Sequence, residues 1–276
     1  MIRLIATDLD DTLLDARSAL TPRTRAALEA AMAAGCKVSL SSGRMLEAML
    51  PFATDMGVNA PMLLYNGAWI YDHCTDETVY AARIANTTAT AIARRAEEMG
   101  LYIQAYPGRG YFCDEVCAYT LKYAAQIRVD GIPVHQPISQ WIAESGADMQ
   151  KLLIIDTPEG ATRAIEALRE EFPHGATFLK SKPHFVEIAP EGVDKGQSLA
   201  RLAAWYGFER DQVMAFGDGQ NDVPMIAWAG HGVAMQNACP EALAAAKVIA
   251  PPNTQDGVAQ VIEGLLEKGE IGASAG

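Results

Sequence analysis

The stretch from Ile2 to Leu14 constrains the fold of this chain more than any other. Residues 2–7 form a short apolar run that favours a buried β-strand, and it ends in carboxylates at Asp8, Asp10 and Asp11. Carboxylates are poor strand residues, so we expect the strand to end there. In open parallel sheets, ligands bind just beyond the carboxyl ends of the strands. The stretch therefore predicts a chemically active sheet edge.

The spacing of Asp8 and Asp10 indicates what chemistry that edge supports. Residues two apart share a face of an extended chain, so both carboxylates can reach one reacting centre. Two neighbouring carboxylates repel each other and need a cation or a shared proton. Mg²⁺ suits an all-oxygen site and commonly sits with substrate phosphates. Taken alone, the motif fits an Asp-rich turn in solvent equally well.

Composition excludes several classes of partner. The chain has 276 residues, enough for one large or two modest domains, and a net charge of −12. This charge argues against nucleic acid or an anionic membrane as the main partner, but a small anionic substrate stays possible beside a metal ion. The five scattered cysteines and the lack of an apolar leader or membrane-length run favour a cytoplasmic protein. We expect a monomer or small homo-oligomer.

Strands and helices alternate in the first part of the chain. After Thr21, a capping residue, Pro22 opens a helix to about residue 34, and a strand follows over residues 37–41. Residues 61–65 form a third strand, followed by the turn dipeptide Asn66-Gly67. This alternation predicts a parallel sheet with helices on both faces.

The order of expected strands and helices changes near residue 83, and the new pattern predicts an inserted α+β domain with its own sheet. Its middle, around Trp141, is irregular in sequence. The expected elements are helices over residues 87–99 and 158–171 and strands over residues 101–106, 151–156, 177–180 and 185–189. We therefore predict a first part of the core domain at 1–82, the insert at 83–189 and a second part of the core domain at 190–276.

Further polar residues follow strands or begin helices outside the insert. Asp218 follows a strand over residues 212–216, where it would complete an oxygen cage for Mg²⁺. Asn221 and Asp222 stand at the expected start of the next helix, whose free N–H groups attract anions. Each feature alone also fits an ordinary turn.

Two more clusters suit a phosphate. Ser42 and Gly43 precede a helix, where a hydroxyl and backbone amides make a phosphate cradle. Lys195 stands at a helix start, an unfavourable place for a cation unless an anion neutralises it. An N-cap serine and a solvated lysine are the alternatives.

The combined pattern resembles the haloacid dehalogenase (HAD) superfamily, in its Cof-like branch, subfamily IIB, of sugar-phosphate phosphatases with a large α/β cap. The resemblance covers nearly the whole chain, including the order of the motifs and the insert between the second and third. It departs at Asp11, where glycine is common, and at Ser42, where threonine is common. The motifs that carry it are Asp8-x-Asp10-x-Thr12, Ser42-Gly43-Arg44, Lys195-Gly196 and Gly217-Asp218-x-x-Asn221-Asp222.

The resemblance implies an α/β fold: a doubly wound, Rossmann-like parallel-sheet core with the cap inserted. It implies Mg²⁺-dependent hydrolysis in which Asp8 attacks phosphorus and Asp10 serves as acid and then base. Asp8, the Asp10 carbonyl and Asp218 would hold the metal, and Asp222 would orient waters or Lys195. The partner is a small phosphorylated metabolite, with sugar phosphates expected.

Phosphate contacts are implied for Ser42, Gly43, Lys195 and Asn221, although Ser41 could replace Ser42 by a shift of one residue. Specificity is expected to come from the cap and its surroundings. The candidate substrate contacts are Arg44, Asn66, Lys182 and His184, with Tyr106, Arg109 and Lys180 as further cap residues.

Two other functions fit the same sequence. A phosphomutase or phosphotransferase would share the acid–base pair and pass the phosphoryl group to a second alcohol. A non-catalytic phospholigand-binding protein is less consistent with the sequence, since none of the expected catalytic positions is missing.

Overall fold

The computed structural model describes residues 1–272. Contacts divide the chain into two compact units. Unit 1 consists of Met1–Gly43, Leu50–Tyr80 and the chain from Asp194; unit 2 consists of Arg44–Met49 and Ala81–Val193. The domain limits predicted from the sequence, with an insert at 83–189, stay a proposal. The short segment Arg44–Met49 groups with unit 2, although the sequence prediction placed it in the core domain.

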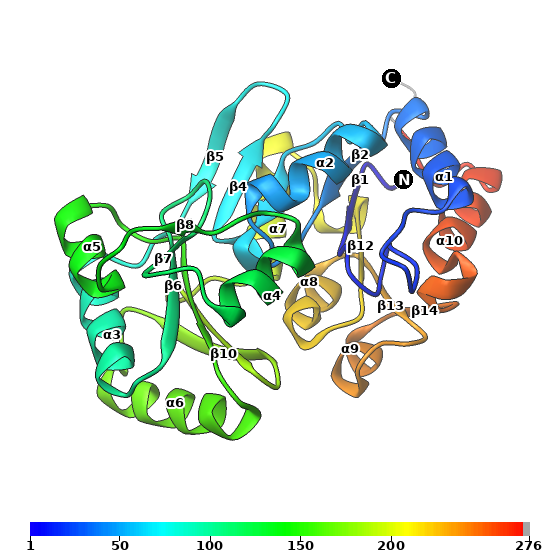
Figure 1. Ribbon diagram of the computed structural model, residues 1–276. Helices are drawn as coiled ribbons and strands as arrows, with labels where there is room; N and C mark the ends of the chain where they lie inside the picture. Colours follow the sequence, from blue (N-terminus) through cyan, green and yellow to red (C-terminus); the bar gives the residue numbers. More distant parts are fainter. Residues whose placement is uncertain (273–276) are drawn as a thin grey trace. The chain divides into compact units, whose positions relative to one another are not determined.

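Unit 1 is built on a five-stranded parallel sheet in the order β14-β13-β12-β1-β2 (Figure 1). β1 and β12 are buried along their whole length, as central strands of a parallel sheet must be when both faces are covered. The loops after β1, β2 and β12 therefore leave neighbouring strands at one edge. The strands are β1 (Leu4–Thr7), β2 (Lys37–Leu40), β12 (Val213–Gly217), β13 (His231–Met235) and β14 (Val248–Ala250).

Helices cover both faces of this sheet, which confirms the predicted fold class. On one face, α7 and α8 pack against alternate strand residues such as Leu4, Ala6 and Val213. On the other side, α1 and α10 pack against each other (Figure 1). Thr21 caps α1 by accepting a hydrogen bond from the Thr24 amide. The helices are α1 (Pro22–Ala33), α2 (Leu46–Met56), α7 (Lys195–Tyr206), α8 (Val223–Trp228), α9 (Pro240–Ala245) and α10 (Gly257–Glu267).

The third strand joins the parallel sheet only through a single parallel bridge, between Ser41 and Leu63, and otherwise belongs to a separate sheet. β3 (Met62–Leu64) pairs antiparallel with β4 (Trp69–Asp72), and β5 (Glu77–Ala81) completes a separate three-stranded sheet. The turn at η1 (Tyr65–Gly67) reverses the chain directly, with Asn66 in the left-handed region at φ 56°. A tight turn connects antiparallel strands, so this dipeptide pairs β3 with β4, while β3 keeps one parallel bridge beside β2.

Unit 2 is a six-stranded sheet in the order β10-β11-β9-β6-β7-β8, with α3, α5 and α6 packed on one face. Two helices, α4 and α5, lie in the middle that the sequence analysis expected to be irregular. α4 begins without a serine, threonine, aspartate or asparagine cap and ends at Arg128 in the left-handed conformation that usually marks glycine, so both sequence signals were missing. The elements are α3 (Asn86–Glu98), β6 (Tyr102–Tyr106), β7 (Phe112–Cys113), α4 (Ala118–Ile127), β8 (Ile132–Pro133), α5 (Ile138–Ser145), β9 (Lys151–Ile155), α6 (Pro158–Glu171), β10 (Thr177–Lys182) and β11 (Phe185–Ala189).

No helix within residues 1–272 combines the length and the apolar character needed to cross a bilayer.

Candidate active site

Side chains from separate elements of unit 1 meet where β1 and β12 end. Lys195, the first residue of α7, is fully buried and donates from Nζ to Asp8 Oδ1 and to Asp222 Oδ1, each at 2.6 Å. It also donates to the Ser41 carbonyl at 3.1 Å. Oxygen atoms of Asp8, Asp218 and Asp222 all lie within 4.8 Å of one another. The structure thus brings together Asp8, Lys195, Asp218 and Asp222, which the sequence analysis proposed for one site.

Asp222 uses both carboxylate oxygens within the protein. Oδ1 accepts from Lys195, while Oδ2 accepts from the backbone N–H groups of Asp218 at 3.0 Å and Gly219 at 2.9 Å. This arrangement suits a residue that orients the lysine and the loop after β12. The close packing explains the preceding glycine, because a Cβ on Gly217 would lie 2.4 Å from the Asp222 Cβ. Asp222 thus contacts Lys195 and the loop after β12, and its role in orienting the lysine stays a proposal.

The helix expected to start at Asn221 and Asp222 begins at Val223 and is preceded by a separate turn. Gln220–Asp222 form a 3₁₀ turn, η3, and the α-helix α8 runs only over Val223–Trp228. Pro224 falls in the first turn of α8, and its carbonyl would lie 2.5 Å from a Cβ on Gly196. Glycine after Lys195 therefore allows α7 and α8 to approach closely enough for Lys195 to reach Asp222.

Asp218 is held by a residue that the sequence analysis did not count as part of the site. The hydroxyl of Thr12, itself buried, donates to Asp218 Oδ1 at 2.6 Å. This bond joins the loop after β1 to the loop after β12. Thr12 stood in the recognised Asp-rich motif, but nothing in the local sequence reveals a partner 206 positions away. Asp10 is half-buried in the same loop.

Burial, reinforced by excess negative charge, shifts the pKa values of the site. Burial and the neighbouring Asp222 carboxylate raise the pKa of Asp8 well above its usual value, although Lys195 opposes them. Burial, with Asp222 and Asp11, likewise raises the pKa of Asp218 to about 6 against the Thr12 hydrogen bond. Burial disfavours charged Lys195, but the two carboxylates outweigh it and raise the lysine pKa.

The donor set fits a divalent cation. Within the cluster, one ammonium stands against three carboxylates, so a hard cation would balance charges that otherwise favour protonation. The three carboxylates of the cluster offer only oxygen atoms to a metal, the ligand type that Mg²⁺ prefers. Asp8 and Asp218 are the carboxylates best placed to bind it, since both oxygens of Asp222 are already engaged.

The residues proposed to bind phosphate form a neighbouring group in unit 1. Asn221 donates from Nδ2 to Asn66 Oδ1 at 3.0 Å. The backbone N–H of Asn66 donates to the Ser42 carbonyl, also at 3.0 Å. A Cβ on Gly43 would lie 3.1 Å from the Asn66 side chain. Asn66, first considered only as a substrate contact, thus links the segment of Ser42 to that of Asn221. Ser41 is fully buried, and its hydroxyl has no partner within residues 1–272; the choice of Ser42 over Ser41 stays a prediction.

Other candidate substrate contacts belong to unit 2. Arg44 lies in the segment that groups with this unit, and Lys182 and His184 flank the β10–β11 turn. The His184 ring packs edge-on against Phe185, with centroids 4.3 Å apart. Burial, followed by the charges of Lys122 and Lys182, lowers the His184 pKa. Contact of Arg44, Lys182 and His184 with a substrate remains a proposal. Lys180 instead donates to the Thr162 hydroxyl and the Pro158 carbonyl on α6.

Two asparagines far along the chain bind the backbone of the loop that carries Asp8 and Asp10. Asn237 donates to the Asp11 carbonyl at 2.8 Å and accepts from the Asn253 amide at 3.1 Å. Asn253 is buried and donates from Nδ2 to the Leu14 carbonyl at 2.8 Å. The sequence analysis missed both residues, because a side chain that binds a backbone carbonyl leaves no pattern in the sequence.

Replacing Asn253 by alanine is expected to destabilise the protein by about 1–3 kcal/mol, since it leaves the buried Leu14 carbonyl without its donor. Urea denaturation measures the loss. Asn253→Asp is the isosteric comparison: it sets an acceptor against the carbonyl and should cost at least as much. An aspartate variant as stable as the natural protein would contradict this role.

Comparison with known proteins agrees with the geometry. The family model of haloacid dehalogenase-like hydrolases matches residues 5–262. The Bacillus subtilis protein YxeH, which carries a provisional phosphatase name, is 31% identical over 96% of this chain and 99% of its own length. The Escherichia coli pyridoxal phosphate phosphatase YbhA is 27% identical over 94% of this chain and 97% of its own.

A solved structure shows the same fold. A haloacid dehalogenase-like hydrolase from Bacteroides thetaiotaomicron superposes with a TM-score of 0.88 at 28% identity, covering 96% of this chain and 100% of that one. The fold, the motif residues and the sequence similarity over nearly the full length all indicate the same family. The chain belongs to the haloacid dehalogenase-like hydrolases, and among them it is a phosphomonoester hydrolase.

Proposed function

We propose that this protein is a Mg²⁺-dependent phosphatase of small phosphorylated metabolites, sugar phosphates foremost, that works through an aspartyl-phosphate on Asp8. The observation that carries the proposal is the buried Lys195, whose ammonium lies 2.6 Å from both Asp8 and Asp222. A buried lysine needs carboxylate partners, and here they are also the residues that a phosphoryl transfer would use.

In the first step, an Asp8 oxygen attacks phosphorus and the bond to the ester oxygen breaks. Asp10, in its acid form, gives its proton to the departing alkoxide, so the alcohol leaves neutral. The product is a phosphorylated Asp8, which divides one difficult displacement into two easier ones. Lys195, at 2.6 Å from Asp8 Oδ1, holds the nucleophile and faces the negative charge of the phosphoryl group.

In the second step, Asp10, now a carboxylate, takes a proton from water. The resulting hydroxide attacks the same phosphorus, and the bond to Asp8 breaks to release inorganic phosphate. Asp8 and Asp10 return to their starting protonation states. Ser42, Gly43 and Asn221 would bind the phosphoryl oxygens through both steps. Mg²⁺ held by Asp8, Asp218 and the Asp10 carbonyl would reduce the repulsion between the anionic nucleophile and the phosphate dianion.

Free-phosphate release tests the proposal. We expect release from sugar phosphates, and screening should include nucleotides and pyridoxal phosphate, the substrate named for YbhA. EDTA should abolish release and added Mg²⁺ restore it, because the carboxylate cluster then regains its balancing cation. Undiminished turnover in EDTA would contradict the metal requirement. Phosphate recovered on a second sugar rather than free would show a phosphomutase.

A further inference from the structure

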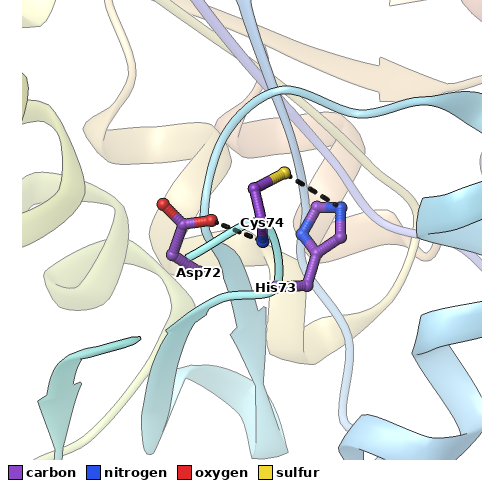
Figure 2. A group of neighbouring side chains, drawn as sticks. All are labelled: Asp72, His73 and Cys74. Atoms are coloured by element: carbon purple, nitrogen blue, oxygen red, sulfur yellow. Dashed lines mark hydrogen bonds between the residues drawn. The ribbon is translucent and has the colours of Figure 1, made fainter. Parts of the chain in front are cut away.

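The turn between β4 and β5 gathers three different metal-binding side chains outside the candidate active site. Asp72, His73 and Cys74 are consecutive, and one ligand atom from each lies within 4.8 Å of the other two (Figure 2). They offer an oxygen, a nitrogen and a sulfur. The mixed donor set contrasts with the candidate active site, where the grouped side chains of Asp8, Asp218 and Asp222 are all carboxylates.

The spacing of the sulfur and nitrogen atoms suits tetrahedral coordination. Cys74 Sγ lies 3.7 Å from His73 Nε2, and Figure 2 shows the two side chains facing each other. With Zn–S bonds of about 2.3 Å and Zn–N bonds of about 2.0–2.1 Å, a tetrahedral site separates these ligand atoms by roughly 3.6 Å. The pair therefore needs little movement to share a metal ion.

Asp72 fixes the turn and supplies the third donor. Its Oδ1 accepts a hydrogen bond from the Cys74 amide at 2.9 Å, which closes the turn and sets the position of Cys74. The other carboxylate oxygen takes no part in this bond. Asp72 and His73 are partly buried and Cys74 is exposed, so an ion could enter from solvent on the cysteine side.

The surroundings of His73 Nδ1, the second ring nitrogen, indicate how tightly such a site would bind a metal ion. Nδ1 is buried and has no hydrogen-bond partner within residues 1–272. Metal-bound histidines usually donate their other N–H to an acceptor, and loss of that support costs about 10–100-fold in affinity. The imidazole is thus not engaged elsewhere, but binding should be weaker than at a fully supported zinc site.

We propose that Asp72, His73 and Cys74 bind a thiophilic divalent cation of the zinc class, with solvent as the fourth ligand. Sulfur and imidazole donors select Zn²⁺, Co²⁺ or Cu²⁺ over Mg²⁺. The thiol proton passes to solvent as the metal–sulfur bond forms. The protein would then bind two chemically distinct cations, one at an all-oxygen site and one at the end of this hairpin.

Cobalt titration of the full chain tests the proposal. The reduced protein, freed of metal and kept in excess Mg²⁺, is titrated with Co²⁺ and followed by the near-ultraviolet charge-transfer band of a thiolate–cobalt bond. We expect one equivalent to bind and Zn²⁺ to displace it. Cys74→Ser should remove the band, and Asp72→Asn should weaken binding by about tenfold or more. Cys117→Ser, a matched change in unit 2, should leave the titration unchanged.

The readout separates this site from the active site, because it records a metal–sulfur bond rather than turnover. Circular dichroism checks that Cys74→Ser folds, and cobalt binding to His73→Gln provides an independent second variant. Absence of the band in the natural protein, or its persistence in Cys74→Ser, would overturn the proposal whether or not the protein hydrolyses phosphate esters.

Discussion

Asp8→Asn is expected to lower phosphate-ester hydrolysis by about 10⁴-fold or more, because an amide oxygen cannot replace the carboxylate that attacks phosphorus. The fold should survive, since asparagine keeps the size of the side chain and an oxygen that can accept from Lys195, which now lies 2.6 Å away. Release of phosphate from a responsive sugar phosphate, with Mg²⁺ present, measures the effect.

Asp11→Asn provides the matched control in the same loop. Asp11 is exposed and has φ 58°, a left-handed conformation that asparagine tolerates well. We expect activity within a few-fold of the natural protein. Comparable losses in both variants would assign the effect to the loop as a whole, and an active Asp8→Asn enzyme would end the assignment of Asp8 as nucleophile.

Lys195→Met should have the largest effect on stability. It leaves Asp8 and Asp222 buried without the ammonium that both now contact, and breaking a buried ion pair from one side costs roughly 3–5 kcal/mol. Hydrolysis should fall by about 10²-fold or more, because a cation that faces the phosphoryl group is lost. Urea denaturation in EDTA measures stability without a bound metal.

The double variant Lys195→Met, Asp222→Asn separates the two effects. Removing the carboxylate that faced the lysine should recover part of the lost stability, while the asparagine side chain of Asp222→Asn keeps an oxygen for the backbone amides of Asp218 and Gly219. Activity should stay low, because the cation is still absent. Strictly additive losses of stability would show that Lys195 and Asp222 do not form the coupled pair described here.

Much of this architecture could be predicted because the informative signals are local. α6 over Pro158–Glu171 and β11 over Phe185–Ala189 have the predicted limits. For α6 the reason is visible: Thr157 accepts from the Gly160 amide, and Pro158 begins the helix. The grouping of Asp8 with Asp218 followed from a general rule, since parallel neighbours release their carboxyl ends at the same edge.

The sequence predictions fail where the local signals for a helix or strand are weak, or where the residue that a side chain contacts lies far away in the sequence. β3 was expected to extend the parallel sheet, but it meets that sheet only at the Ser41–Leu63 bridge and pairs along its length with β4. α4 lacks both the N-cap residue and the C-terminal glycine that indicate a helix in sequence, and α5 has only the terminal Gly146. The bond between Asn253 and the Leu14 carbonyl joins residues 239 positions apart, so only the folded chain reveals it.

The pairing of β1 with β12 also determines how the molecule is assembled. Leu4 is in register with Val213, so β1 can pair early with β2 but gains its second neighbour, β12, only after some two hundred more residues are synthesised. Nearly all of unit 2 is contiguous and is synthesised in between, so it can acquire its shape first. Such distant pairings slow folding and leave β-strand edges exposed during translation. We expect β1 to reach its native pairing later than unit 2 folds, although β1 is synthesised earlier.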